Sequence, residues 1–292
     1  MVAQILAAAM PDLTTRGLKP VASNEEFDSW AVGTTVVKFP RSEEHAAKVS
    51  REQAMHLALR GAVGEIVPDI VGAADPTGAF PFPFLAYERA RGRPGQTSEG
   101  PMVQPKPWAR SKLAGQVATA FGAVHAIAVR SAKTAGVPVR AVEFDPGIDA
   151  SEEAIAWARK IAGNGVDDFL MDPLPVDARA PAKGVLCHGD VKGEHLFVSE
   201  DGTRLTAIVD WADLVIADPA VDLAGLVIWL GPGFVGDVVD SYLGPKDEGT
   251  VARAVFLARL GLLNYLDEVL ARGEQGPERI VEAQLRAAFS TA

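Results

Sequence analysis

The segment 184–222, GVLCHGDVKGEHLFVSEDGTRLTAIVDWADLVIADPAVD, alternates short apolar runs with acidic loops. The first run predicts a brief buried strand that ends just before Asp190. Two further runs, 196–198 and 206–209, are separated by a polar turn, which predicts a hairpin with Asp210 at its exit. Both aspartates are therefore expected on loops that follow strand ends.

The spacing of the polar residues in this segment matches the requirements of phosphoryl transfer. Kinase catalytic loops follow H-x-D-x-x-x-x-N, and a later Asp holds the metal ion. Here His188 and Asp190 fill the first two positions, and His195 stands at the Asn position. We expect Asp190 to accept or orient the proton of an attacking hydroxyl, and Asp210 to coordinate Mg²⁺ at the phosphates of a nucleotide. His188 is expected to fix the loop by hydrogen bonds.

HGDVKGEH and the following IVDWADLVIADPAVDLA resemble the antibiotic phosphotransferases, the aminoglycoside and macrolide kinases that share a protein-kinase-like fold. Most of that superfamily carries Asn where this chain has His195, whereas the macrolide 2′-phosphotransferases resemble it in having His there. The resemblance implies an α+β fold of two lobes, with a small antiparallel sheet in the N-terminal lobe and a larger, mostly helical C-terminal lobe.

The resemblance also implies an enzyme that moves the γ-phosphate of a nucleoside triphosphate, GTP or ATP, to an antibiotic hydroxyl with Mg²⁺ as cofactor. His195 favours the 2′-hydroxyl of a macrolide amino sugar as acceptor. His195 would ligate the metal only as neutral imidazole, and since Mg²⁺ prefers oxygen it would otherwise position a water or a phosphate oxygen. Asp222 is expected to brace the catalytic loop, and Asp218 to cap a helix that begins at Pro219.

The charge and cysteine content narrow the class of partners and the compartment. The chain has 292 residues, with 28 Lys plus Arg against 38 Asp plus Glu. This acidic balance argues against nucleic acid and favours a cationic small molecule. The single cysteine, Cys187, excludes an intrachain disulfide, fits a reducing cytosol and is expected to be a buried packing thiol. We expect a cytoplasmic monomer or weak dimer.

No membrane partner is expected either. Residues 2–10 are apolar, but no basic residue precedes them and Pro11 ends the run, so they predict a short helix and not a signal peptide. No stretch approaches the about 20 apolar residues that a membrane span needs.

The N-terminal part predicts a nucleotide-binding sheet. Residues 18–40 predict three strands with a polar turn at 23–26. Lys38 stands where a kinase's strand lysine would reach the α and β phosphates, the alternative being a solvent-facing strand lysine. The turn, with Ser23 and Asn24, would lie over the nucleotide, although it lacks the glycines of a protein-kinase loop.

Residues 41–60 predict a helix that presents Glu52 to Lys38, with Glu43 or Glu44 as the alternative partner. The expected inward neighbours of Glu52 are Val49, Leu57 and Leu59. Solvated histidines are expected at His45 and His56.

Two apolar runs, 66–71 and 80–87, would complete an antiparallel sheet of about five strands. The Arg-, Gly- and Pro-rich stretch ERARGRPGQTSEGP that follows marks a linker, which places the hinge at 88–96. The predicted lobes are residues 1–88 and 89–292. The resemblance implies that backbone groups of the hinge bind the purine, and a basic anion site is the alternative for its arginines. The hinge candidates are Glu88, Arg89 and Ala90.

The remainder predicts a helical lobe. Residues 108–128 carry a core-helix pattern in which His125 is a satisfied core histidine, and the acidic segment 142–177 predicts helices over the substrate cleft. Residues 231–236 match G-x-G-x-x-G, but no strand precedes them, so they predict a loop between helices. Further helices are predicted at 235–242, 250–272 and 278–289.

Three other functions remain open from the sequence. The first is a kinase for aminoglycosides or for another hydroxylated metabolite, which would prefer a carboxylate-rich cleft. The second is a degenerate protein that binds nucleotide or ligand without transferring phosphate. The third is a metallohydrolase, whose zinc ligands would be His188, Asp190, His195 and Asp210.

Overall fold

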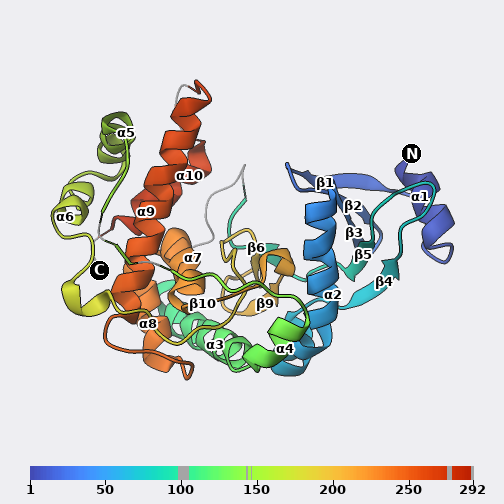
Figure 1. The fold of residues 1–292 in the computed structure, drawn as a ribbon, viewed down its shortest axis with the longest axis horizontal. Coiled ribbons are helices and arrows are strands. Elements are labelled where there is room, and N and C mark those ends of the chain that lie inside the picture. The colour runs from blue at the N-terminus through green and yellow to red at the C-terminus, as the bar shows by residue number, and fades with distance from the viewer. Residues whose placement is uncertain (98–104, 143, 146, 275–277, 291–292) are drawn as a thin grey trace.

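The computed structural model describes residues 1–97, 105–142, 144–145, 147–274 and 278–290. Figure 1 shows a lobe that contains a β-sheet beside a larger lobe that is mostly helical. This arrangement confirms the predicted α+β, kinase-like architecture. Among the described residues, no helix combines the length and the apolar character needed to cross a bilayer.

The N-terminal lobe is built on an antiparallel sheet of five strands in the order β1-β2-β3-β5-β4. Its strands are β1 (Lys19–Ser23), β2 (Phe27–Val32), β3 (Thr35–Pro40), β4 (Ile70–Ala74) and β5 (Phe84–Glu88). Because side chains alternate along a strand, Val37 and Phe39 of β3 pack with Leu6 of helix α1 (Val2–Ala9), and Lys38 points to the other face. Helix α2 (Glu43–Val63) covers that face.

Two expectations for α2 were wrong. Leu57 is 83% exposed, because it lies five residues from Glu52 and therefore on the opposite side of the helix. His56 is buried, since it follows Glu52 by four residues, and its Nε2 lies 3.1 Å from Oδ1 of Asp69. His45 is half-buried rather than solvated.

The C-terminal lobe packs helices around one large apolar core. They are α3 (Pro107–His125), α4 (Val129–Thr134), α5 (Glu152–Ala162), α6 (Gly165–Met171), α7 (Ala220–Leu230), α8 (Pro232–Ser241), α9 (Thr250–Ala271) and α10 (Arg279–Ala288). Short 3-10 turns are η1 (Gly64–Ile66), η2 (Val176–Ala178) and η3 (Trp211–Asp213). In the acidic segment that forms α5 and α6, Glu143 lies outside the described residues, as do residues 98–101 of the linker.

Short strands carry the predicted catalytic segment. Strand β7 (Val185–Cys187) pairs with β10 (Val215–Ala217), and β8 (Leu196–Val198) forms the predicted hairpin with β9 (Leu205–Ile208). Strand β6 (Arg93–Pro94) in the linker pairs with β8, so the chain already joins the C-terminal lobe at Arg93.

The glycine-rich stretch 231–236 is not the loop that we expected. Gly231 turns the chain with φ of +83°, and α8 begins at the next residue, Pro232. Proline suits the first helical position because its φ is already helical and its missing N–H has no partner there. The rest of the motif is therefore helix.

Helix α7 lies directly against the backbone that follows Asp190. A Cβ atom on Gly225 of α7 would overlap the carbonyl oxygen of Val191. Only glycine lets this helix and the catalytic segment approach so closely.

We expect Gly225→Ala to lower the free energy of unfolding by at least about 2 kcal/mol, because the helix must move away from Val191. The matched control is Gly261→Ala in α9, where a Cβ atom meets nothing within 4 Å. Alanine favours helix, so the control is expected to gain up to about 1 kcal/mol. Denaturant unfolding of both variants measures this, and equal effects would contradict the proposed packing.

Candidate active site

The loop after β7 is held in place by one buried carboxylate. Asp222, in the first turn of α7, accepts hydrogen bonds from the backbone N–H of His188 at 2.8 Å and of Gly189 at 2.9 Å. The His188 ring donates from Nε2 to the carbonyl oxygen of Val209 at 2.9 Å, and its Nδ1 accepts from the Asp190 N–H. Both residues therefore fix the loop, as predicted.

A second buried layer supports Asp222. Nε2 of His125 lies 3.0 Å from Oδ2 of Asp222, and Nδ1 of the same ring lies 2.5 Å from the Tyr242 hydroxyl. Burial alone would raise the pKa of Asp222, but the bond from His125 and the Gly189 N–H hold that pKa below its ordinary value. His125 is thus a satisfied core histidine. Asp218 likewise accepts from the backbone N–H of Ala220 at the start of α7.

Asp190 lies at the end of this loop beside two nitrogen groups. Nζ of Lys192 lies 3.0 Å from its Oδ2, and Nδ1 of His195 lies 3.6 Å from the same oxygen. Burial acts to raise the pKa of Asp190, but these neighbours outweigh it and keep that pKa below its ordinary value. Asp190 is therefore ionised at neutral pH and able to accept a proton.

The hydrogen bonds of His195 define its tautomer. Nδ1 lies 2.8 Å from the backbone carbonyl oxygen of Asp190, which can only accept, so Nδ1 carries a proton. Burial lowers the pKa of the ring below its ordinary value. The neutral ring then directs the lone pair of Nε2 at Oδ2 of Asp210, 3.5 Å away.

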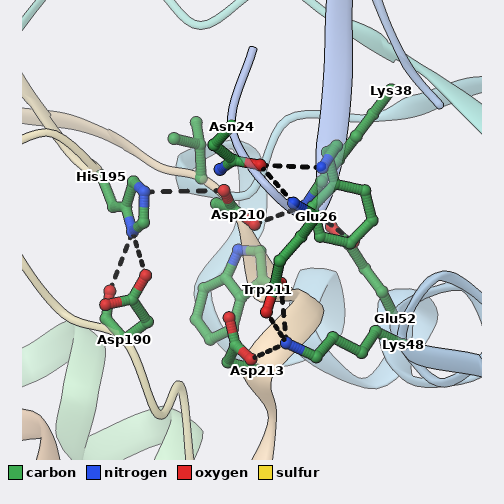
Figure 2. A network of polar contacts seen from close by, with 12 residues as sticks. Asn24, Glu26, Lys38, Lys48, Glu52, Asp190, His195, Asp210, Trp211 and Asp213 are labelled. Carbon is green, nitrogen blue, oxygen red and sulfur yellow. Dashed lines mark hydrogen bonds and ion pairs between the residues drawn. The ribbon is translucent and has the colours of Figure 1, made fainter. Parts of the chain in front are cut away.

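Asp210 follows β9 in a left-handed backbone conformation with φ of +65°. Its Oδ1 lies 2.5 Å from Nζ of Lys38, which lies 4.0 Å from Oε2 of Glu52 (Figure 2). The structure thus brings Lys38, Glu52 and Asp210 together, and the alternative partners Glu43 and Glu44 are exposed instead.

The charges of this cluster shift one another's pKa values. Burial acts to lower the pKa of Lys38, but Asp210 and Glu52 raise it above its ordinary value. Burial acts to raise the pKa of Asp210, yet Lys38 drives it well below its ordinary value. Burial raises the pKa of Glu52 above its ordinary value, since the attraction of Lys38 does not offset the loss of solvent and the repulsion from Asp210.

The polar turn is held by its own side chains. Oδ1 of Asn24 accepts from the backbone N–H of Glu26 at 2.9 Å and of Phe27 at 2.8 Å. The Ser23 hydroxyl donates to Asp28 in an exposed cluster, so it is not directed at Lys38.

The three hinge residues differ in what their backbone can still bind. The N–H of Glu88 donates to Asp69 and the N–H of Arg89 donates to Thr34. Within the described residues, the N–H of Ala90 makes no hydrogen bond. Two of the hinge arginines have partners elsewhere, since Arg91 pairs with Glu88 and Arg93 donates to the carbonyl oxygen of Glu200.

The geometry also bears on the metallohydrolase alternative. In the described parts of the chain, the one group of three metal-ligating side chains is His125, Cys187 and Asp222, which are buried and hydrogen-bonded to their surroundings. The ligand atoms of the set that we considered for zinc do not converge in this way, and His188 uses its ring to hold the loop. Cys187 is buried in an apolar cluster with Val185 and Val215, which confirms a packing role, and burial raises the pKa of its thiol well above the ordinary value.

Two lysines that lie at the site were not identified from the sequence. Lys192 lies two residues after Asp190, and that short spacing was the signal that could have identified it. Nζ of Lys48 lies 2.8 Å from Asp213 and 2.6 Å from Glu26, and nothing in the sequence connects these distant positions.

A hollow of about 410 Å³ on α10, lined by Arg279, Glu282 and Arg286 among others, contains none of these residues. A second hollow of about 420 Å³ lies between Val63 at the end of α2 and Gln116 of α3. Neither hollow holds the predicted catalytic groups.

We expect Lys38→Met to lower the free energy of unfolding by about 3 kcal/mol at pH 7, because it leaves two carboxylates without their counter-ion. The stabilisation of ionised Asp210 by Lys38 is present above the ordinary aspartate pKa of about 4 and is lost as the pH falls through the lower folded value. The difference from wild type should therefore shrink in acid.

Denaturant titrations at pH 7 and in acid check this dependence. The control is Lys19→Met, because Lys19 is exposed on β1 and is expected to change stability by less than about 0.5 kcal/mol. A deficit for Lys38→Met that does not vary with pH would show lost packing instead of a lost ion pair.

The chain also resembles solved structures in its fold. The GDP and kanamycin complex of APH(2")-IIia superposes with a TM-score of 0.72 at 20% identity, covering 98% of this chain and 96% of that one. A macrolide 2′-phosphotransferase from Brachybacterium faecium gives a TM-score of 0.65 at 20% identity, with coverage of 100% and 98%. These likenesses establish the fold.

Sequence comparison gives a relative and a family. Viomycin phosphotransferase of Streptomyces vinaceus is 25% identical over 257 residues, which is 85% of each protein. The model of the phosphotransferase enzyme family matches residues 17–255, which include every catalytic and nucleotide-site candidate described above. This chain therefore belongs to the phosphotransferase enzyme family.

Proposed function

We propose that the protein transfers the γ-phosphoryl group of a nucleoside triphosphate to a hydroxyl of a cationic antibiotic, with Mg²⁺ as cofactor. The observation that carries this proposal is the convergence of Asp190 and Asp210 on His195 while Lys38 pairs with Asp210 from the other lobe. A base, a metal ligand and a phosphate-binding ammonium are the groups that kinase chemistry needs.

The residues around Asp210 fit a magnesium ion. The lone pair of His195 Nε2 and Oδ2 of Asp210 are acceptors 3.5 Å apart, and Lys38 occupies the other oxygen, Oδ1, so the pair of acceptors can serve a hydrated cation. Asp210 would hold the ion through oxygen, and His195 would hold one of its waters. The chemistry supplied there is neutralisation of charge on the donor's phosphates.

The chain's own groups would perform the transfer. Asp190 orients the acceptor hydroxyl and takes its proton as the new oxygen–phosphorus bond forms, and the bond to the bridging oxygen breaks to release the nucleoside diphosphate. Lys192, 3.0 Å from Asp190, keeps that carboxylate ionised. Since the transition state is loose, most of the gain comes from positioning.

On the donor side, we assign the purine contact to the hinge. Of Glu88, Arg89 and Ala90, the residue whose backbone N–H remains available within the described chain is Ala90. The turn that carries Ser23 and Asn24 would cover the phosphates through its backbone, since both side chains are used within the turn region. Glu52 would hold Lys38 toward those phosphates.

A carboxylate beside Asp190 supports a cationic acceptor. Glu194 is half-buried in the catalytic loop and forms no ion pair within 4.0 Å among the described residues. Burial raises its pKa, the nearby Lys192 ammonium acts to lower it, and the neighbouring Asp190 and Glu278 raise it further, so that its pKa lies above the ordinary value. A bound ammonium group would relieve this repulsion.

For the acceptor we favour the 2′-hydroxyl of a macrolide amino sugar. The reason is His195, because the macrolide 2′-phosphotransferases resemble this chain in having His at that position. An aminoglycoside or a cationic peptide antibiotic is the second candidate. The unpaired Glu194 and the likenesses to a kanamycin complex and to viomycin phosphotransferase favour it.

Nucleotide turnover with Mg²⁺ and GTP or ATP, measured against erythromycin, kanamycin, hygromycin and viomycin, separates these acceptors. We expect one acceptor to stimulate turnover, and Asp190→Asn to lower kcat by about a hundredfold or more because it removes the proton acceptor. Stimulation by erythromycin alone supports the macrolide assignment, and stimulation by another compound overturns that assignment. Bound nucleotide without turnover on any acceptor would contradict the antibiotic substrate.

We expect Lys192→Met to move the acidic limb of the kcat/KM profile to higher pH, because loss of the ammonium raises the pKa of Asp190. Lys192→Arg keeps the charge and is the matched control, with the limb close to wild type. A limb that does not move in Lys192→Met would show that Lys192 does not control the ionisation of Asp190.

A further inference from the structure

Lys48 forms an ion-pair bridge between two segments that flank the proposed nucleotide site. Its Nζ lies 2.6 and 2.7 Å from the two carboxylate oxygens of Glu26, and 2.8 Å from Oδ1 of Asp213 (Figure 2). The Lys48 side chain is 15% exposed. It lies one helical turn before Glu52, and so on the same face of α2.

The two carboxylates belong to different lobes. Glu26 is in the turn between β1 and β2, whose backbone is held by Asn24. Asp213 is the last residue of η3, three residues after Asp210. One ammonium therefore connects the turn proposed to cover the phosphates with the segment that carries the proposed metal ligand.

Apolar packing at the same place confirms that η3 docks on the N-terminal lobe. Ala212 of η3 is buried in a cluster with Phe27 of β2, Val49 of α2 and Leu85 of β5. Ala212 lies directly before Asp213, and Val49 lies directly after Lys48. The ion pairs thus lie at the edge of an apolar contact between the lobes, where water is partly excluded.

We propose that Lys48 is a positioning residue that couples the two halves of the phosphoryl-transfer site. Through Glu26 it sets the turn over the nucleotide, and through Asp213 it sets the backbone that presents Asp210. The inference rests on the proposed nucleotide site.

The electrostatics give the direction of the effect. Without Lys48, the carboxylates of Glu26 and Asp213 would face each other across the lobe contact without the ammonium that now lies between them. Like charges at this separation repel in a partly buried setting. The turn and η3 would therefore move apart, which loosens the donor site without removing any group that touches the substrates.

The two halves of the bridge predict different kinetic defects. Glu26→Gln weakens the half that holds the turn, so it should raise the nucleotide KM by about fivefold and change kcat by less than about twofold. Asp213→Asn weakens the half that holds the Asp210 segment, so it should raise the Mg²⁺ concentration for half-maximal rate by about fivefold at unchanged nucleotide KM. A general loss of protein stability would not separate an effect on nucleotide KM from an effect on Mg²⁺ dependence.

The experiment measures kcat, nucleotide KM and Mg²⁺ dependence for wild type, Lys48→Met, Lys48→Arg, Glu26→Gln and Asp213→Asn. We expect Lys48→Met to show both defects, with kcat/KM reduced about fiftyfold or more, and Lys48→Arg to recover most of the loss since it keeps the charge. The matched control is Lys133→Met on α4, where the lysine is exposed and forms no ion pair among the described residues.

A double-mutant cycle separates charge coupling from misfolding. If Lys48 acts by neutralising Glu26, the effects of Lys48→Met and Glu26→Gln on KM should combine to less than their product, because removing the carboxylate relieves the repulsion. Unfolding curves show the folded fraction of each variant.

Kinetics of Lys48→Met within about twofold of wild type would overturn the proposal, as would identical defects in Glu26→Gln and Asp213→Asn. Failure of the wild-type protein to bind nucleotide would instead overturn the proposed function. The two failures are therefore distinguishable in one set of measurements.

Discussion

The ion pair between Lys38 and Asp210 is the interaction on which the site depends. It joins the central strand of one lobe to the loop after β9 in the other, with 2.5 Å between Nζ and Oδ1. Both groups are costly to bury alone, so each is stable only when the other is present. A bound nucleotide and metal would take over these charges, because phosphates attract Lys38 and a cation attracts Asp210. The pair therefore keeps both groups ready for the charges of the donor.

The catalytic loop is fixed from behind by a separate set of contacts. Asp222 accepts two backbone N–H groups of the loop, and His125 supports that carboxylate in turn. Gly225 lets α7 approach the loop backbone so closely that no side chain would fit. Positioning therefore comes from rigid, buried groups behind the loop, while the carboxylates of Asp190 and Asp210 remain partly exposed, at 38% and 31%. This division suits a reaction in which orientation supplies most of the rate.

The sequence was sufficient to predict those elements that depend on short, local patterns of residues. The strands of the N-terminal lobe, the hairpin that ends at Asp210 and the loop at Asp190 follow from short patterns of apolar and polar residues. The sequence did not predict features that depend on contacts between distant parts of the chain. The inward face of α2 could not be assigned from a helix of weak amphipathicity, so Leu57 was placed inside and His56 outside. The two residues of the Lys48–Asp213 ion pair are 165 positions apart in the sequence, and no local pattern predicts the contact.

The most direct test of the metal site is calorimetric binding of GTP and ATP with and without Mg²⁺, to wild type and to Asp210→Asn. We expect Mg²⁺ to tighten binding to wild type by about tenfold or more, and Asp210→Asn to lose this gain while still binding nucleotide without metal. Binding to wild type that is indifferent to Mg²⁺, or a metal effect that survives Asp210→Asn, would contradict the assignment of Asp210 and with it the proposed donor site.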